Sequence, residues 1–203
     1  MSGVIGLTAS VGAGKTTVSE IFRQKGALII DCDKIVRDLY LTEEGIAIIG
    51  SSFPEAIIGG QINKELLRRH AFATPVSKQK LESLIHPIVE REVAKFIQEH
   101  PKDLIVIEIQ LLFEAGVDKN PAYSISHTVL VDAPKEQRKA RVLKTRTGWT
   151  EEKFDNIDSQ QMPHEEKKRR ADFTINNFDG ADVSAQVDEI IRSVRANGQH
   201  RGK

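Results

Sequence analysis

Short apolar segments alternate with longer amphipathic segments along this chain, and the alternation predicts strands separated by helices. Apolar runs of strand length occupy residues 3–8, 27–31, 103–109, 127–132 and 172–176. Helical apolar spacing lies between these runs, so crossover helices would connect the strands in parallel. The pattern therefore predicts an α/β fold with three layers, built around a five-stranded parallel sheet.

Helices are predicted most clearly near the two ends of the chain. The first would begin at Lys15, place Val18 and Phe22 on its buried face and end at Gly26, because glycine tolerates the left-handed conformation at a helix end. The last carries apolar residues at i, i+4, i+7, i+8 and i+11 from Val183 and would end before Asn197. Both helices would pack one apolar face against the sheet.

Two helical insertions are predicted in addition to the core. The segment between the second and third strands is too long for a simple crossover, so we predict a helical subdomain at residues 39–101. Residues 136–169 carry many charges and one aromatic pair, which is typical of helices that arch over a cleft. The core would then comprise residues 1–38, 102–135 and 170–196, followed by a basic tail at 197–203 that we expect to be disordered.

The composition favours a cytoplasmic protein without a nucleic-acid or membrane partner. Twenty-nine basic residues balance 29 acidic ones, so no net positive field attracts polyanions. The single cysteine cannot form an intramolecular disulfide, and the six histidines lack metal-ligand spacing. We find no signal peptide or membrane-span pattern in the sequence. A monomer is the default expectation, and any bound anion must be held by local contacts.

Residues 9–17, ASVGAGKTT, match the phosphate-loop pattern GxxxxGK[ST] except that Ala9 replaces the first glycine. An apolar strand precedes the match and a helical pattern follows it, which is the context that the motif requires. If position 9 needed a positive φ, alanine would cost on the order of 1 kcal/mol there. This is small beside the many charge-assisted hydrogen bonds of a bound nucleotide, so we predict that the site is retained.

The remaining loop residues have the chemistry that a triphosphate needs. The backbone of Gly12 and Gly14 would approach the phosphate oxygens, where a β-carbon would collide. Lys15 would supply a positive charge to the terminal phosphates, and the hydroxyl of Thr16 would ligate Mg²⁺ at the positive end of the helix. We therefore predict a site for ATP with Mg²⁺, with these nucleotide-binding residues: Gly12, Ala13, Gly14, Lys15, Thr16 and Thr17.

Carboxylates are predicted at the ends of two strands, where open α/β sheets bind their ligands. Asp31 and Asp33 would point to the same side of an ending strand, so that one could accept the proton of an attacking hydroxyl while the other orients Mg²⁺. Glu108 ends the apolar run LIVIE and could reach a water bound to Mg²⁺. Spacing alone leaves the alternatives open, namely a helix cap followed by a surface acid, and an exposed strand-end acid.

With these motifs in order, the chain resembles the dephospho-CoA kinases, which use ATP to phosphorylate the ribose 3′-hydroxyl of dephospho-coenzyme A. The resemblance covers nearly the whole chain and rests on these stretches: IGLTASVGAGKTT, IDCD, INKELLRRHAF with LESLIHPIV, LLFEAG, LVDAPKEQ and QMPHEEKKRRADFTINN. It implies a phosphate-loop kinase core with a helical substrate-binding insertion and a helical lid. ATP and dephospho-coenzyme A would be its substrates, and Mg²⁺ would accompany the ATP.

The resemblance also implies roles for individual residues. Asp33 would receive the proton of the 3′-hydroxyl, and Glu108 and Thr16 would hold the metal. Arg138, Arg141 and Arg146 could close on ATP as a lid. Compared with the usual arginine spacing of the family, this chain has one extra residue between Arg141 and Arg146, so it stays open which of these two arginines meets the phosphates. Contacts with dephospho-coenzyme A would come from Thr8, Asp31, Asp33, Arg68, Arg69 and His86.

Some positions depart from the family pattern, and two other functions stay open. Ala9 and Ser10 replace two glycines that are usual in the family, and Gln110 replaces a proline. A related kinase that acts on a nucleoside, nucleotide or sugar acid would differ only in the insertion. A nucleotide-dependent switch is disfavoured, because the string nearest to its NKxD motif, Asn63-Lys64-Glu65-Leu66, lacks the aspartate.

Overall fold

The computed structural model describes residues 3–200, with side chains described through residue 196. The chain divides into two units: unit 1 comprises residues 1–30 and 97–203, and unit 2 comprises residues 31–96. Among the described helices, none combines the length and the apolar character that a bilayer crossing requires.

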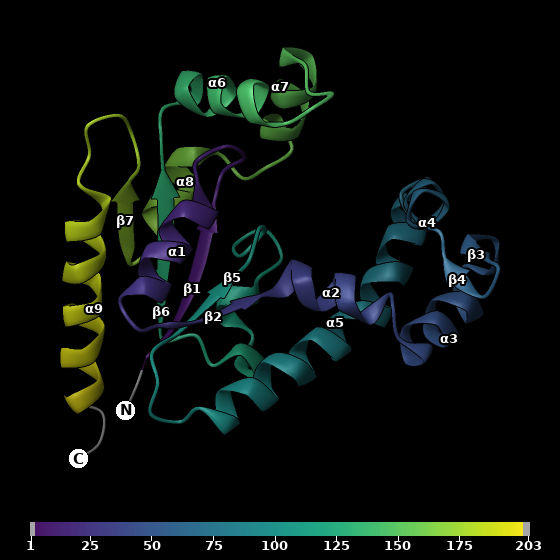
Figure 1. Ribbon diagram of the computed structural model, residues 1–203, viewed down its shortest axis with the longest axis horizontal. Coiled ribbons are helices and arrows are strands. Elements are labelled where there is room, and N and C mark those ends of the chain that lie inside the picture. Colours follow the sequence, from purple (N-terminus) through teal and green to yellow (C-terminus); the bar gives the residue numbers. More distant parts are fainter. Residues whose placement is uncertain (1–2, 201–203) are drawn as a thin grey trace. The chain divides into compact units, whose positions relative to one another are not determined.

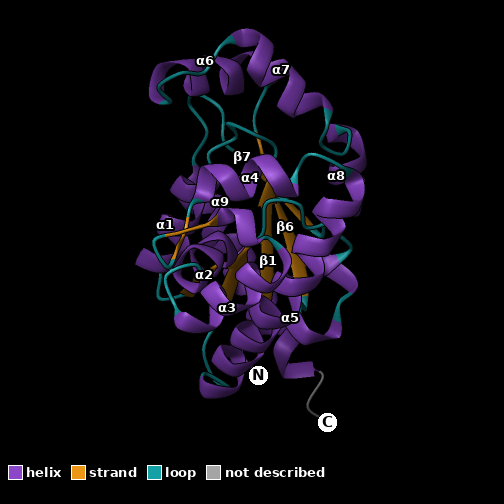
Figure 2. Cartoon of the chain, turned by 90° about the vertical axis from the view of Figure 1, so that its right-hand side faces the viewer, coloured by secondary structure: helices purple, strands orange, loops and turns teal. Residues whose placement is uncertain are grey.

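The core of unit 1 is the five-stranded sheet that the sequence predicted (Figure 2). The strand order is β2-β5-β1-β6-β7, and β1 pairs in parallel with both β5 and β6. β7 pairs in parallel with the other edge of β6. The prediction of an α/β fold is confirmed, with each strand within about two residues of its expected bounds: β1 (Val4–Ala9), β2 (Leu28–Asp31), β5 (Ile105–Glu108), β6 (His127–Asp132) and β7 (Phe173–Asn176).

Helices of unit 1 begin and end mostly as their apolar spacing predicts. α1 starts at Lys15 and is followed by Gly26 at φ +87°, the left-handed conformation expected after its end. α9, predicted to end before Asn197, continues to His200, since a glycine within a helix costs only about 1 kcal/mol. The end of the predicted tail, residues 201–203, lies outside the described residues. The helices are α1 (Lys15–Gln24), α6 (Lys135–Thr145), α7 (Glu151–Ser159), α8 (His164–Arg170) and α9 (Val183–His200), with short 3₁₀ turns at Val117–Lys119 and Pro121–Tyr123.

The main apolar core of unit 1 lies between the sheet and the two helices α1 and α9, which run beside it (Figure 1). Phe22 of α1 and Val187 of α9 are fully buried among strand residues such as Leu7 and Val129. Burial of each such side chain stabilises the fold by about 1.5–3 kcal/mol. Because this core fixes α1 against β1, it also fixes the turn that joins them, which is the phosphate loop.

Unit 2 is helical and includes one small hairpin that the sequence analysis did not predict. Gly59 and Gly60 adopt φ +58° and +76° between the two strands, as a two-residue hairpin turn requires. The Gly-Gly pair between apolar segments was the signal for this turn. The elements of unit 2 are α2 (Cys32–Leu39), α3 (Glu43–Ser52), a 3₁₀ turn (Pro54–Ala56), β3 (Ile57–Ile58), β4 (Gln61–Ile62), α4 (Lys64–Ala71) and α5 (Pro75–Glu99), whose last residues belong to unit 1.

Candidate nucleotide site

The loop between β1 and α1 has the backbone geometry of a phosphate cradle. Gly12 and Gly14 adopt φ +80° and +91°, a region that side chains disfavour. A β-carbon on Gly12 would lie 2.5 Å from the carbonyl oxygen of Arg138, and one on Gly14 would lie 2.3 Å from Nδ2 of Asn177. The positive φ favours glycine at both positions, and at Gly12 a backbone contact excludes a β-carbon as well.

Ala9 causes no strain, although it replaces a glycine of the motif. It is the last residue of β1 and is 2% exposed. Among the described non-glycine residues only Ser124 has a positive φ. The penalty considered for alanine at position 9 therefore does not arise, because the positions that need the left-handed conformation come later in the loop.

Lys15 and Glu108 meet beside the loop, at the carboxyl ends of β1 and β5. Their Nζ and Oε2 atoms lie 3.6 Å apart, and each side chain is 12% exposed. Lys15 is also the first residue of α1, where the backbone N–H groups have no partner within the helix and the helix dipole attracts anions. This combination of an ammonium group and free amides suits a polyphosphate.

Oxygen donors near the loop fit a magnesium ion that arrives with a nucleotide. Thr16 lies exposed in the first turn of α1, next to Lys15, which contacts the carboxylate of Glu108. Within the described residues no group of three His, Cys, Asp or Glu side chains forms a metal site. Mg²⁺ does not need such a group, because it keeps several waters and binds one or two protein oxygens together with substrate phosphates. The donor set therefore fits Mg²⁺ with ATP, not a metal held by the protein alone.

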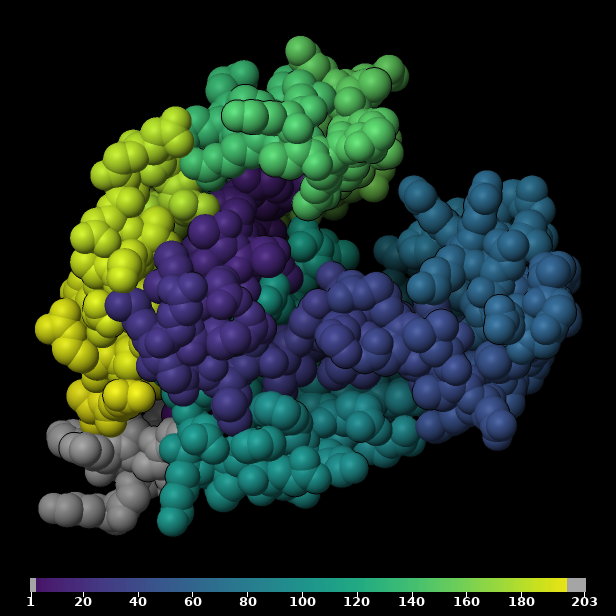
Figure 3. Space-filling view, in the orientation of Figure 1, coloured from purple at the N-terminus to yellow at the C-terminus, as the bar shows by residue number. Residues whose placement is uncertain are grey.

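The segment that was predicted as a lid packs on the phosphate loop (Figure 3). Val11 of the loop forms a small buried cluster with Val142 of α6 and Phe154 of α7. Trp149 and Ile157 pack against this cluster. Loop and segment therefore share a core of their own, separate from the main core of unit 1.

Arg138, one of the three arginines predicted to close on ATP, is buried against the phosphate loop. It is 4% exposed, its Nε donates to the carbonyl of Ala133 at 3.1 Å, and its Nη1 donates to the carbonyl of Val11 at 3.0 Å. Nη1 also contacts the carboxylate of Asp158 at 2.6 Å. The helical spacing that placed Arg138 and Arg141 on one face could not reveal that this cation is enclosed by the loop and α7. Arg138 thus binds the loop and Asp158 in this structure, and a contact of Arg138 with ATP stays a prediction.

The two remaining lid arginines lie in different surroundings. Arg141 donates to the carbonyl of Asn177 at 2.8 Å, and the side-chain amide of Asn177 donates to the carbonyl of Ala13 at 2.8 Å. Arg146 is exposed, and its guanidinium lies 4.9 Å from the ring centroid of Trp149. Arg141 is thus linked to the loop through one intervening residue, Asn177. Arg146 instead stacks on Trp149, an aromatic side chain of its own segment.

Thr8 is fully buried one position before the end of β1. Its hydroxyl donates to the carbonyl of Gln110 at 3.2 Å, which ties β1 to the residue that follows β5 by two positions. The hydroxyl is therefore satisfied within unit 1. A contact between Thr8 and a substrate stays a prediction.

The argument that placed Asp31 and Asp33 on one side of a strand is wrong, because α2 begins at Cys32. Asp31 caps this helix, accepts a hydrogen bond from the N–H of Lys34 at 3.0 Å and pairs with Arg37 at 2.9 Å. Asp33 lies exposed in the first turn of α2. The alternative interpretation, a helix cap followed by a surface acid, describes their local structure, and a role of Asp33 in proton transfer stays a prediction.

The other predicted contacts of dephospho-coenzyme A also lie in unit 2. Arg68 and Arg69 are exposed in the last turn of α4. His86 is exposed on α5 directly before Pro87, and the helix continues through this proline. The His-Pro pair is therefore not a helix boundary, and these three side chains are free to contact solvent or a ligand.

Sequence reasoning did not single out Gln161 and Asn177, although both contact the loop. Gln161 accepts a hydrogen bond from the N–H of Val11 at 3.0 Å through its Oε1. Their only signal was their place in the stretch QMPHEEKKRRADFTINN, in which Gln161 is the first residue and Asn177 the last. Single-residue spacing gives no sign of such contacts, because their partners lie far away in the sequence.

A buried ion pair holds the segment before α8 in place. Nζ of Lys167, which is fully buried, lies 2.9 Å from Oε1 of Glu114, and the same oxygen accepts a hydrogen bond from the N–H of Met162 at 3.0 Å. Burial by itself would raise the pKa of Glu114, but Lys167 and the backbone amides together outweigh it and hold this pKa below its ordinary value. The carboxylate therefore stays charged at neutral pH.

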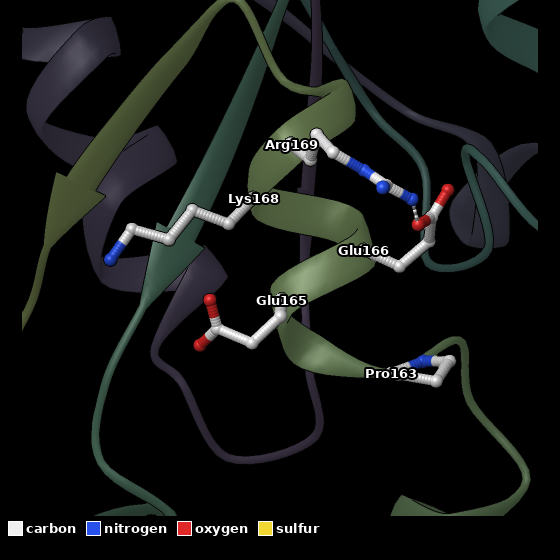
Figure 4. A pocket seen from close by; sticks show the side chains of 5 residues that line it. All are labelled: Pro163, Glu165, Glu166, Lys168 and Arg169. Carbon is white, nitrogen blue, oxygen red and sulfur yellow. Dashed lines mark ion pairs between the residues drawn. The ribbon is translucent and has the colours of Figure 1, made fainter.

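A surface hollow on α8 is lined by charges of both signs (Figure 4). Glu166 pairs with Arg169 on one side of the helix, while Lys168 contacts Asp132 at 3.6 Å. None of the lining residues belongs to the phosphate loop: Pro163, Glu165, Glu166, Lys168 and Arg169. Since no positive charge is left uncompensated there, we do not assign the hollow to a phosphate-bearing ligand.

Comparisons with known proteins agree with this geometry. The family model described as dephospho-CoA kinase matches residues 3–182. A dephospho-CoA kinase of Agrobacterium fabrum is 34% identical over 197 residues, covering 95% of this chain and 98% of the relative. One of Mesorhizobium japonicum is 36% identical over 202 residues, covering 95% and 96%.

Solved structures share the fold as well. A Thermus thermophilus crystal structure superposes with a TM-score of 0.82 at 31% identity and covers 97% of each chain. A dephospho-CoA kinase from Campylobacter jejuni gives 0.62 at 22% identity, covering 95% of this chain and 97% of that one. An Acinetobacter baumannii shikimate kinase gives 0.55 at 17% identity, covering 97% and 95%, and so shares the fold alone. The loop, the sheet and these matches confirm the resemblance seen in the sequence, and the chain belongs to the dephospho-CoA kinase family.

Proposed function

We propose that this protein transfers the γ-phosphoryl group of ATP to the ribose 3′-hydroxyl of dephospho-coenzyme A, giving coenzyme A and ADP in the last step of coenzyme A biosynthesis. The observation that carries the proposal is the loop at Gly12 and Gly14, whose conformation favours glycine and which leads into Lys15 at the start of α1. Membership of the family over residues 3–182 supports the identity of the acceptor. A cytoplasmic location and a monomeric state stay predictions from the sequence.

The donor half of the reaction follows from the chemistry of the loop. Phosphoryl transfer has a loose transition state, so the protein mainly aligns the reactants and neutralises the spreading negative charge. Lys15 would place its ammonium group against the terminal phosphates, and the amides of Gly12, Gly14, Lys15 and Thr16 would bind phosphate oxygens. Glu108, 3.6 Å from Lys15, would keep that ammonium group oriented in the free enzyme.

Magnesium would enter with ATP and would supply charge neutralisation on the phosphate oxygens. Thr16 would hold it through its hydroxyl, and Glu108 would hold it directly or through one of its waters. Arg141, which already contacts Asn177 beside the loop, is the better placed of the two lid arginines to meet the phosphates. Arg146, stacked on Trp149, would reach them only after leaving that ring.

The acceptor half of the reaction is assigned to unit 2. We assign proton removal from the 3′-hydroxyl to Asp33, which is exposed at the start of α2. Asp31 would cap the start of this helix and would also contact the acceptor ribose. Arg68 and Arg69 would bind the pyrophosphate of dephospho-coenzyme A, since a guanidinium group can match two phosphate oxygens at once, and His86 would contact the same substrate.

A substitution at Asp33 tests the proposal. Asp33→Asn removes the proton acceptor but keeps the shape of the side chain, so ATP binding should remain and turnover should fall by a factor on the order of 10². The matched control is Asp38→Asn, which changes another exposed acid of α2 that pairs with Lys34. Near wild-type turnover of Asp33→Asn would remove this residue from the role.

An ADP-release assay separates the possible acceptors. With Mg²⁺ and ATP, release should be slow and should rise sharply on addition of dephospho-coenzyme A. Equal stimulation by adenosine or a sugar acid would favour another small-molecule kinase. Stimulation only by a protein partner would favour a nucleotide-dependent switch.

A further inference from the structure

Polar backbone groups of the phosphate loop are bound by side chains of three later segments: two carbonyl groups and one N–H group. Arg138 of α6 binds the carbonyl of Val11 at 3.0 Å, and Asn177, directly after β7, binds the carbonyl of Ala13 at 2.8 Å. Gln161, between α7 and α8, accepts the N–H of Val11 at 3.0 Å. Both polar backbone groups of Val11 are thus occupied by protein, and so is the carbonyl of Ala13.

Because the peptide bond is planar, these contacts also determine the direction in which the neighbouring amide N–H groups point. In a trans peptide, the carbonyl of one residue and the N–H of the next point in opposite directions, and the described chain contains no cis peptide. The carbonyl of Val11 points to Arg138, so the N–H of Gly12 points away from Arg138. By the same argument, the N–H of Gly14 points away from Asn177.

These two amides are also left available for a ligand. Within the described part of the chain, no hydrogen bond occupies the N–H of Gly12 or Gly14, whereas the N–H of Ala13 donates to the carbonyl of Ser10 at 3.1 Å. An amide donor that faces a cradle without a partner is what an anion site uses. The polar backbone groups of the loop are therefore of two kinds. The N–H and carbonyl of Val11 and the carbonyl of Ala13 are bound by side chains, whereas the N–H groups of Gly12 and Gly14 have no partner among the described residues.

We propose that Arg138 and Asn177 are positioning residues that aim the amides of Gly12 and Gly14 at the phosphates of the nucleotide, and that Gln161 supports them by holding the preceding peptide through the N–H of Val11. The inference deepens the proposed function, since it rests on nucleotide binding at this loop. None of the three side chains needs to touch ATP. They act by fixing three peptide planes, Ser10–Val11, Val11–Gly12 and Ala13–Gly14, so that the amides do not have to be ordered when the nucleotide binds.

Burial supports the role of Arg138 in particular. Its guanidinium is enclosed, pairs with Asp158 and lies 5.7 Å from the ring centroid of Phe154. These contacts restrict the orientation of the guanidinium group. A buried ion pair is weak evidence for stability, but it can fix one geometry among several. Here the geometry that it fixes is the direction of a peptide plane in the loop.

Two isosteric substitutions with neighbouring controls test the proposal. Asn177→Leu removes the donor to Ala13, and its control is Asn176→Leu, at the adjacent exposed position. Gln161→Met removes the acceptor for Val11, and its control is Gln160→Met, whose side chain contacts Asn156 instead. The dissociation constants of ATP and of inorganic tripolyphosphate are measured by calorimetry, and thermal unfolding is followed in parallel.

Each test variant should bind ATP and tripolyphosphate about tenfold more weakly, by the same factor for both ligands, because each loses one hydrogen bond that orients the loop. In turnover assays, KM for ATP should rise while KM for dephospho-coenzyme A stays unchanged. The controls should match the wild type. If Asn177→Leu does not fold, Gln161→Met still decides the question.

ATP affinities equal to those of the controls would overturn the proposal. So would a loss of ATP affinity without a loss of tripolyphosphate affinity, because the effect would then not act on the phosphate loop. The measurement needs no acceptor substrate. A protein that shows the predicted losses but does not phosphorylate dephospho-coenzyme A would refute the proposed function and leave this inference standing.

Discussion

The phosphate loop of unit 1 and the predicted acceptor contacts of unit 2 differ in how their side chains are held. Around the loop, charged groups are enclosed and paired: Arg138 is 4% exposed and Lys15 is 12% exposed at its side chain. In unit 2, Arg68 and His86 are exposed on helix surfaces. The proposed phosphate site is thus a backbone loop whose shape enclosed residues maintain, whereas the predicted acceptor contacts are exposed side chains on helix surfaces.

The largest expected effect is on stability, from the loss of an enclosed arginine. Arg138→Met removes the cation and leaves Asp158, among the described residues, with Lys135 at 3.7 Å as its basic partner, so the free energy of unfolding should fall by about 3 kcal/mol. The counterpart in unit 2 is Arg91→Met, which breaks exposed pairs with Glu44 and Glu92. The free energy of unfolding of Arg91→Met should not differ measurably from that of the wild type.

Denaturant titration of the two variants checks this contrast. Equal stabilities of Arg138→Met and Arg91→Met would show that enclosure does not distinguish the two regions. A double variant that adds Asp158→Asn to Arg138→Met should recover part of the loss, because the carboxylate left behind no longer carries a charge.

The next largest effect is expected from substitution of a glycine with positive φ, and it should differ between Gly12 of the loop and Gly59 of the hairpin. Gly12→Ala places a β-carbon 2.5 Å from the carbonyl oxygen of Arg138, so it should cost on the order of 2 kcal/mol in stability and weaken ATP binding. Gly59→Ala in the hairpin of unit 2 meets no atom within 4 Å and should cost about 1 kcal/mol, with ATP affinity unchanged. Calorimetric titration with ATP and thermal unfolding measure both quantities. Unchanged ATP affinity in Gly12→Ala would contradict the tight fit of the loop.

A smaller effect is expected from an exposed arginine of unit 2. Arg68→Met should raise KM for dephospho-coenzyme A about tenfold, because one charge-assisted contact with a phosphate is lost. KM for ATP and the melting temperature should stay at their wild-type values. The matched control is Lys64→Met, at the start of the same helix α4. A similar rise of KM in both variants would indicate a general charge effect in place of a specific contact.

The smallest effect concerns pH and the buried pair near α8. The pKa of Glu114 is lowered in the folded protein, so its contribution to stability is present above the unfolded pKa and is lost as the pH falls through the folded pKa. Stability should therefore decline in acid more steeply than in a double variant, Glu114→Gln with Lys167→Met, which lacks both charges. Urea titrations at a series of acidic pH values measure the slopes. Identical slopes would show that this pair does not contribute to the acid response.

Features that depend on neighbouring residues could be predicted from the sequence. The five strands and the start of α1 follow from local apolar spacing, and the loop was found despite Ala9 because Gly12 and Gly14 remain. The hairpin at Gly59 was missed although its turn signal is local, because the surrounding spacing was interpreted as helical only. At Asp33 the error was the opposite one, because strand geometry was extended into a segment where the helix α2 begins at Cys32.

Features that depend on distant residues could not be predicted in this way. Arg138 contacts a residue 127 positions earlier, and Asn177 contacts one 164 positions earlier. Both side chains carry polar groups that are usually solvated, so their residue types suggested surface positions. Their contacts exist only because β1, β6 and β7 lie next to each other in the sheet, which brings the ends of these strands together.

The conformation of Ala9 bears on how such proteins are recognised in genomes. A search pattern that insists on glycine at the first place of GxxxxGK[ST] passes over this chain, although its backbone there is an ordinary strand. The places where the backbone conformation favours glycine are the fourth and the sixth of the pattern, Gly12 and Gly14. Patterns weighted by which torsion angles the loop demands would retain divergent kinases that literal consensus strings discard.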